Sequence, residues 1–202
     1  MHRLSYPLVT AVLAVTALLP ITLVAAAPAA AARTGVVTGS STSDGPGLPV
    51  ADGRDQVRLM SVRGAGPFRI GARFARLSAA GLIDWTAPEC DGGVVAGVTG
   101  AWAGKLILTF RAGRLVGIGT ATAPPRSPAG ASVGMSFARL EEIYGPRGEL
   151  VGNDAGTASA YLVRVGSRVE LFTGHPIRPG VGYFQIGLAS VVERAFREGR
   201  PC

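Results

Sequence analysis

The chain has few of the residues from which metal sites and nucleic-acid sites are usually built. Its 202 residues include two cysteines, two histidines and one lysine, Lys105, and only one histidine, His175, lies beyond the second residue. This inventory does not supply the four ligands of a structural zinc site. The nineteen arginines form neither a basic run nor a stripe with aromatics, and the 29 glycines form no phosphate-binding loop. We therefore expect no metal, no cofactor and no nucleic-acid partner, although a net charge of +7 allows weak attraction to an anionic envelope surface.

A hydrophobic run long enough for an ordinary transmembrane helix is also missing. Residues 1–32 have the pattern of a secretory signal peptide: a short basic start, an apolar run over residues 8–24 that Pro20 interrupts, and small residues up to Ala32. A retained membrane anchor is the open alternative, but it needs roughly 20 uninterrupted apolar residues. We expect cleavage after Ala32 and a secreted chain without a transmembrane segment.

The two cysteines, Cys90 and Cys202, lie in the part of the chain that is expected to be exported. Export allows an even number of cysteines to form disulfides, so we predict a Cys90–Cys202 bridge, with two free thiols as the alternative. A disulfide that closes such a long loop would stabilise the folded protein by roughly 4 to 5 kcal/mol in the chain-entropy model.

A duplicated motif is the clearest positive feature of the sequence. IGARFARL at residues 70–77 returns as VGMSFARL at residues 133–140, 63 positions later. The spacing predicts a tandem repeat, with a first unit over residues 56–122 and a second over residues 131–202. A flexible linker rich in small and polar residues, 33–55, precedes them.

Each unit is predicted to be α+β, with a short helix followed by an antiparallel sheet, and a C-terminal helix follows the second sheet. The offset of 63 carries on into the strands, where it matches Leu108 with Leu171. The terminal helix has no counterpart in the first unit, and a Ser190–Glu193 capping box is expected to start it. The predicted helices begin at Phe74 (ending at Gly81) and at Phe137 (capped by Ser136, ending at Gly145), and the predicted strands cover residues 56–62, 94–99, 105–111, 114–120, 157–165, 168–173 and 181–187.

The loop at residues 173–180 breaks the internal symmetry. It is five residues longer than the corresponding hairpin at Ala112 and Gly113. A lengthened loop on a rigid scaffold is typical of recognition, so His175 and Arg178 are candidate binding residues. A functionally neutral insertion is the alternative.

A hydrolase motif is also present. GASVG at residues 130–134 matches GxSxG around Ser132, and Asp154 and His175 follow in the order of a serine hydrolase. A nucleophile elbow needs a strand directly before the serine, whereas PPRSPA precedes this one. A small secreted serine hydrolase using Ser132 and His175 is therefore the alternative to a protein without enzymatic activity.

Two segments carry a resemblance to known proteins, GPFRIGARFARL at residues 66–77 and SVGMSFARLEEIYG at residues 132–145. The chain resembles the secreted beta-lactamase inhibitor protein family and the related small envelope lipoproteins of outer-membrane assembly. The resemblance is topological and covers roughly residues 64–202. It implies a tandem helix-plus-sheet fold whose sheets form one concave face, and it implies that this face binds another protein.

The chain departs from the inhibitor family in its aromatic content and its cysteines. The inhibitor face is rich in aromatics and each unit carries its own disulfide, whereas this chain has thirteen aromatics and at most one bridge. Beta-lactamase inhibition is therefore not implied. We expect a secreted, non-enzymatic protein whose partner is another secreted or envelope protein. The candidate anchors are the strand and loop aromatics, with core packing as the alternative for each: Trp85, Trp102, Tyr161 and Tyr183.

Overall fold

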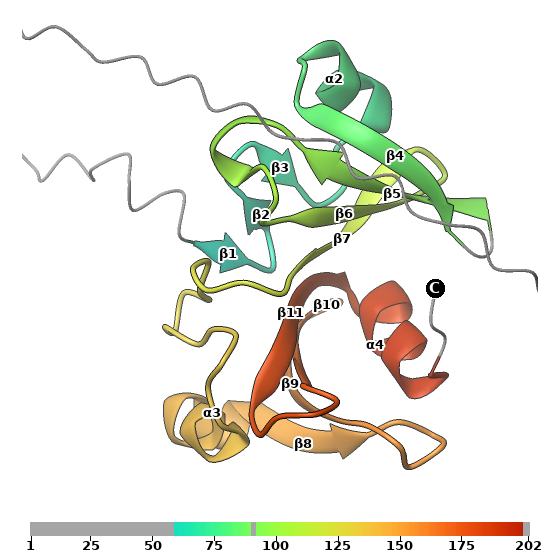
Figure 1. The fold of residues 1–202 in the computed structure, drawn as a ribbon. Coiled ribbons are helices and arrows are strands. Elements are labelled where there is room, and N and C mark those ends of the chain that lie inside the picture. Colours follow the sequence, from blue (N-terminus) through green and yellow to red (C-terminus); the bar gives the residue numbers. More distant parts are fainter. Residues whose placement is uncertain (1–58, 90–91, 200–202) are drawn as a thin grey trace, which may run out of the picture. The chain divides into compact units, whose positions relative to one another are not determined.

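An eight-stranded antiparallel sheet organises the part of the chain that the computed structural model describes, residues 59–89 and 92–199 (Figure 1). The fold is α+β, as predicted. In chain order the elements are β1 (Met60–Ser61), β2 (Gly64–Ala65), β3 (Phe68–Arg69), α2 (Phe74–Ala79), β4 (Ile83–Glu89), β5 (Gly93–Val98), η2 (Gly100–Trp102), β6 (Ile107–Arg111), β7 (Arg114–Thr120), α3 (Phe137–Tyr144), η3 (Gly145–Arg147), β8 (Gly148–Gly152), β9 (Ser159–Val165), β10 (Arg168–Gly174), β11 (Val181–Leu188) and α4 (Ala189–Arg197).

The strand order of the large sheet is β4-β5-β6-β7-β11-β10-β9-β8, and β1, β2 and β3 form a separate small sheet. Strands β4 to β7 form one meander after α2, and strands β8 to β11 form another after α3. The two meanders meet where β7 pairs with β11, with Ile118 opposite Ile186. The last strand of each meander therefore lies at the centre of the sheet, and the first strand of each lies at an edge.

Helices α2 and α3 cover one face of this sheet. Phe74 of α2 meets Phe110 of β6 edge to face at 5.1 Å, and Tyr144 of α3 lies 5.9 Å from Phe172 of β10. Phe172 in turn stacks on Phe184 of β11 at 4.3 Å. These side chains belong to one large core that runs through both halves of the sheet.

Helix α4 packs on the opposite face, against β10, β11 and β7 (Figure 1). Its Val192 is buried in a second, smaller core with Val169, Leu171 and Leu162. Gly117 and Gly187 lie directly under Val192, where the missing side chains let the helix come close to the sheet.

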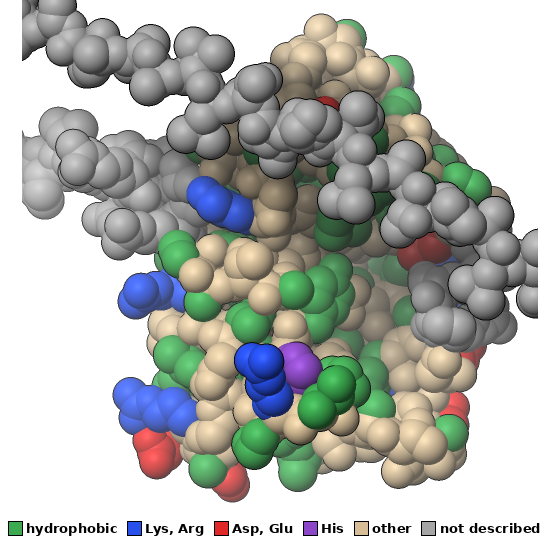
Figure 2. Space-filling view, in the orientation of Figure 1, with side chains coloured by type: hydrophobic (Ala, Val, Ile, Leu, Met, Phe, Trp, Pro, Cys, Tyr) green, Lys and Arg blue, Asp and Glu red, His purple; other side chains and the backbone are tan. Residues whose placement is uncertain are grey.

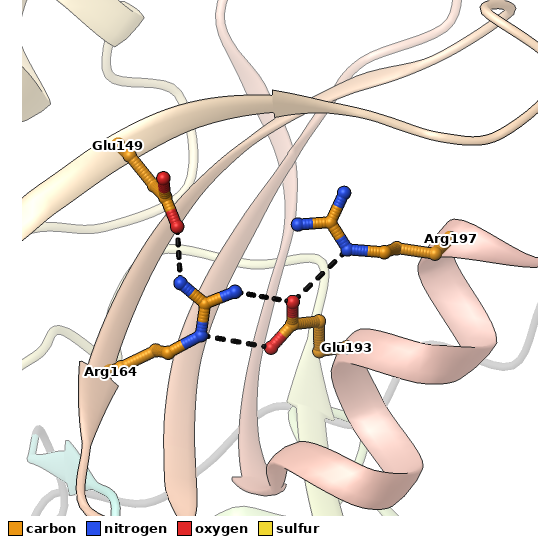
Figure 3. A network of polar contacts seen from close by, with 4 residues as sticks. All are labelled: Glu149, Arg164, Glu193 and Arg197. Atoms are coloured by element: carbon orange, nitrogen blue, oxygen red, sulfur yellow. Dashed lines mark hydrogen bonds and ion pairs between the residues drawn. The ribbon is translucent and has the colours of Figure 1, made fainter.

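Charged side chains also hold α4 to the sheet (Figure 3). Arg164 of β9 donates to both carboxylate oxygens of Glu193, at 3.2 and 2.6 Å, and also contacts Glu149 of β8. Arg197 donates to Glu193 from one turn along the helix, at 3.1 Å. Burial alone would raise the pKa of Glu193, but hydrogen bonds from Arg164 and Arg197 outweigh it and hold that pKa below the usual glutamate range.

Glu193→Gln tests this network. A lowered pKa in the folded state means that the stabilisation is present above the ordinary glutamate pKa and is lost as the pH falls through the folded value. We expect a loss of about 1 kcal/mol in the free energy of unfolding near pH 7, because Arg164 is half exposed and solvent screens the pair. Urea denaturation should show a smaller loss near pH 3, and an equal loss at both pH values would contradict the assignment. The control is Glu142→Gln, from an exposed pair with Arg139, with an expected loss of about 0.3 kcal/mol.

The structure confirms the predicted α3. The helix covers Phe137–Tyr144, the backbone N–H of Arg139 donates to the Ser136 hydroxyl at 3.1 Å, and Gly145 follows with a positive φ. The predicted capping box of α4 is wrong. That helix begins at Ala189 after Leu188 without a side-chain cap, so Ser190 lies inside the first turn, and the Glu193 carboxylate accepts from two arginines.

The sequence offset of 63 does not hold in the strands. Leu108 lies in the large core and Leu171 in the small core, on the opposite face of the sheet. The irregularities in the β6–β7 and β10–β11 pairings, at Thr109 and Thr173, are 64 positions apart. Because side chains alternate between the two faces of a strand, an error of one residue assigns the wrong face.

Several predictions fall on residues outside the described ranges. These are the signal peptide at residues 1–32, the linker at residues 33–55, and both cysteines, Cys90 and Cys202. Within residues 59–89 and 92–199, no helix has the length and apolar character needed to cross a membrane.

Candidate functional site

The sheet face opposite α2 and α3 is covered by α4 where this helix packs against β7, β11 and β10. Trp85 of β4 lies on the part that α4 leaves open, and 46% of its surface is exposed. Its indole lies against Gly97 of the neighbouring strand β5, where a β-carbon would collide with the ring. A glycine thus lets this tryptophan lie close to the sheet and present an aromatic surface to solvent.

Tyr183 of β11 repeats this arrangement on the same face. Its ring lies against Gly119 of β7, again where a β-carbon would collide with it. Burial and the nearby charge of Glu89 raise the pKa of Tyr183 to about 12, so the hydroxyl stays protonated and available as a donor. Trp85 and Tyr183 are therefore positioned in the same way, because each aromatic ring packs against a glycine of the neighbouring strand in the sheet.

A cleft of about 430 Å³ lies between this face and α4. The carboxylate of Glu89 and the guanidinium of Arg111 approach each other at 3.6 Å in its wall, both largely buried. This pair was not predicted from the sequence, although Glu89 ends one strand and Arg111 ends another of the same meander. The cleft is lined by polar side chains of the sheet and apolar side chains of α4, including Thr109, Thr173, Tyr183, Gln185, Val191, Ala195 and Phe196.

The loop between β10 and β11 is fixed by the one histidine of the described chain. The backbone N–H groups of Ile177 and Arg178 both donate to Nδ1 of His175, at 3.1 and 3.2 Å, and the His175 N–H donates to the carbonyl of Gly180 at 2.8 Å. Ile177 is 87% exposed at the tip. Figure 2 shows the histidine side chain on the surface, with basic and hydrophobic side chains beside it. The loop therefore presents an apolar side chain in a fixed backbone conformation.

The structure separates the predicted binding residues into two groups. Trp102 and Tyr161 are 4% and 3% exposed and belong to the large core, where their rings lie against Gly66 and Gly148. Tyr183 is half-buried in the cleft wall, and His175 and Arg178 are exposed on the loop. This second group and the exposed Trp85 are accessible to a partner.

The residues of the hydrolase hypothesis are engaged elsewhere. The Ser132 hydroxyl donates to the carbonyl of Val133 at 3.3 Å, and His175 uses Nδ1 to hold its own loop. Asp154 lies in the loop after β8, where its backbone N–H donates to the carbonyl of Arg197. The described hydrogen bonds thus do not connect the three residues. Within the described ranges, no three or more His, Cys, Asp or Glu residues gather in a way that could hold a metal ion.

The described residues near the two cysteines line a common cavity. Glu89 directly precedes Cys90, Gly199 lies three positions before Cys202, and both line the cleft under α4. Glu89 and Gly199 therefore lie at the same cleft, and the pairing of the two cysteines stays a prediction.

Comparisons with known proteins give no family. No protein-family model and no curated protein matches the chain. Among solved structures, it is similar to a cysteine-rich secretory protein from Staphylococcus aureus subsp. aureus Mu50, with 13% identity, 63% of this chain covered and a TM-score of 0.41. The match spans 47% of that protein, so the chain corresponds to about half of its length.

Proposed function

We propose that this chain is an exported, non-enzymatic protein that binds another secreted or envelope protein through the part of its sheet face that α4 leaves uncovered. The observation that carries the proposal is the exposed ring of Trp85 on that part of the face, with Tyr183 in the wall of the adjoining cleft. The few residues that dominate the binding energy of protein interfaces are enriched in tryptophan, tyrosine and arginine. An aromatic ring packed against a glycine of the neighbouring strand has less freedom to lose when a partner binds, which favours affinity.

The surroundings of the two rings support a protein partner. The Glu89–Arg111 pair and Gln185 add polar groups beside the aromatic surface, in the mixture typical of an interface with an apolar centre and a polar surround. The loop tip at Ile177 adds a projecting apolar side chain, and its backbone is already ordered by His175.

We infer, as part of this proposal, that the two halves arose by duplication. The N–H of Gly71 donates to the carbonyl of Leu115, and the N–H of Leu115 donates to that of Ala72. In the second half Gly134, Val181 and Met135 form the same reciprocal pair of bonds, and Gly71 and Gly134 have φ of 93° and 89°. In both halves the chain therefore enters the helix through a glycine tied to the last strand of its own meander.

A capture experiment with matched variants tests the binding proposal. The chain from residue 33 onward is immobilised and exposed to culture supernatant and solubilised envelope of the producing cells, and each captured protein is then purified and titrated. We expect Trp85→Ala to weaken the relevant complex by at least about tenfold, as for a central aromatic anchor. Leu150→Ala is the control, because Leu150 is 62% exposed on the far edge strand β8 and should not matter.

Two further variants separate the parts of the surface. Ile177→Gly removes the loop tip and leaves the sheet face intact, so a complex that tolerates it does not use the loop. A complex that tolerates both Trp85→Ala and Tyr183→Phe with unchanged affinity would exclude the open face as its binding surface.

A further inference from the structure

A groove beside α2 gathers four arginines around an apolar floor. Its volume is about 540 Å³, and Leu77 and Leu82 contribute to the floor. The basic side chains along it are Arg69, Arg73, Arg76 and Arg114, all from exposed residues. This volume lies in the range of small-molecule sites, and the combination of apolar walls with a few charged groups is typical of them.

The fold brings these charges together. Arg69 ends β3, Arg73 precedes α2, and Arg76 lies on the same side of the helix as Arg73, three positions later. Arg114, which is distant in sequence, pairs with Arg73 in an isolated antiparallel bridge. Arginines that look scattered along the chain therefore lie side by side in the structure.

The described lining of the groove has no acidic group to balance this charge. None of its residues is Asp or Glu, and the ion pairs found in the described part of the chain involve Arg111, Arg139, Arg164 and Arg197 instead. The Arg114 guanidinium donates to the carbonyl of Gly71 at 3.1 Å, which leaves its charge uncompensated. Like charges that line one groove repel one another, and a bound anion would reduce this repulsion.

The second half of the molecule shows that this charge is not required by the fold. Arg139 in α3 lies 63 positions after Arg76 and pairs with Glu142 at 2.5 Å. The residue of α2 that matches Glu142 is Ala79, so Arg76 has no acidic partner at the position where Arg139 has one.

We propose that this groove is a binding site for a small amphiphilic anion, a carboxylate or phosphate group joined to an alkyl chain. Guanidinium groups bind the oxygens of both anions in a bidentate way, which accounts for the arginines. The alkyl chain accounts for the apolar floor, which a bare inorganic anion would leave in contact with water. A hydrophobic cation would be repelled by all four arginines.

This site is independent of the proposed protein-binding surface. Helix α2 covers one face of the sheet, and Trp85 and Tyr183 lie on the other. A protein on the open face and an anion in the groove can therefore be bound at the same time.

The test uses calorimetric titration of the chain from residue 33 onward with octanoate and octyl phosphate. Acetate and inorganic phosphate lack the chain, and octylammonium carries the opposite charge. We expect at least one octyl anion to bind at least tenfold more tightly than its chain-free counterpart and than octylammonium. The ratio between octanoate and octyl phosphate then identifies the preferred head group.

Variants locate the binding. The double substitution Arg73→Gln with Arg76→Gln should weaken it at least tenfold, whereas Arg139→Gln, at the matching position of α3, should leave it unchanged. Ala80→Glu, at an exposed position of the groove, places a negative charge there and should abolish binding while a thermal melt reports an intact fold. The proposal is overturned by any of three results. Neither octyl anion binds, or the chain-free anions or octylammonium bind as tightly as the octyl anions, or both groove variants bind the octyl anions as tightly as the original protein does.

Discussion

Replacing Gly187 by alanine is expected to destabilise the protein strongly, because the added methyl group has no room. Gly187 lies on β11 opposite Gly117 of β7, under helix α4. A β-carbon at Gly187 would lie 2.8 Å from Cγ2 of Val192 and 2.9 Å from Cα of Gly117, and it would collide with the carbonyl oxygen of Val116. Two of these three atoms belong to the backbone, so the clash cannot be relieved by turning a side chain.

The chain can accommodate this methyl group only by moving α4 away or by separating β7 from β11. We expect Gly187→Ala to lower the free energy of unfolding by about 3 kcal/mol, at the upper end for an overpacked interior. Urea denaturation followed by the fluorescence of Trp85 and Trp102 measures the change.

Gly152→Ala is the matched control for this experiment. Gly152 is also a strand glycine, but a β-carbon added to it would have the carbonyl oxygen of Ala158 as its nearest neighbour, at 3.9 Å. Its effect should stay within about 0.5 kcal/mol. Equal denaturation midpoints for the two variants would show that α4 does not rest on Gly187.

Tyr144→Phe is expected to have the second largest effect, and the effect should depend on pH. Glu170 is a buried carboxylate, 6% exposed, and its Oε2 lies 2.5 Å from the hydroxyl of Tyr144. That hydroxyl is also 2.7 Å from the Ser127 hydroxyl, whose oxygen accepts from the N–H of Ala131. Since a carboxylate can only accept, Tyr144 donates to Glu170 and accepts from Ser127.

Burial raises the pKa of Glu170 above the usual range, and the hydrogen bond from Tyr144 opposes that shift. A raised pKa means that the folded state holds the proton more tightly than the unfolded state does. The stability linked to this group is therefore full below the ordinary glutamate pKa and is lost as the pH rises through the folded value.

Removing the Tyr144 hydroxyl leaves the ionised carboxylate buried without its donor. We expect Tyr144→Phe to cost about 3 kcal/mol near pH 8 and about 1 kcal/mol near pH 4, where Glu170 is protonated. Glu170→Gln is the informative second variant, because its amide still accepts from Tyr144 but carries no charge. Its stability should change less with pH than that of the original protein, and a Tyr144→Phe loss that is the same at both pH values would rule out this account.

The sequence pattern of each segment was sufficient to predict helix α3 and the central strand β7. The apolar spacing of Phe137, Leu140 and Tyr144, with Ser136 before them and Gly145 after, defines α3 without any tertiary contact. Strand β7 has the predicted bounds, and the α+β class follows from the same patterns.

The edge strands β4 and β8 were not predicted, for a physical reason. An edge strand has one neighbour, so its sequence is less constrained: β4 contains Pro88, and β8 begins and ends with glycine. The candidate site was predicted only in part, because exposure depends on distant partners. Trp102 is buried against Gly66 and Trp85 lies open on Gly97, and nothing local to either tryptophan distinguishes them.

The pairing of β7 with β11 has a consequence for how the chain folds. Each meander is built from hairpins between consecutive strands, so its contacts join residues that are near in sequence. The four residue pairs from Gly117–Gly187 to Thr120–Phe184 join segments more than sixty residues apart. Closing a long loop costs entropy before its contacts form. The meanders should therefore assemble first, and the pairing of β7 with β11 should form last, as the rate-limiting step of folding.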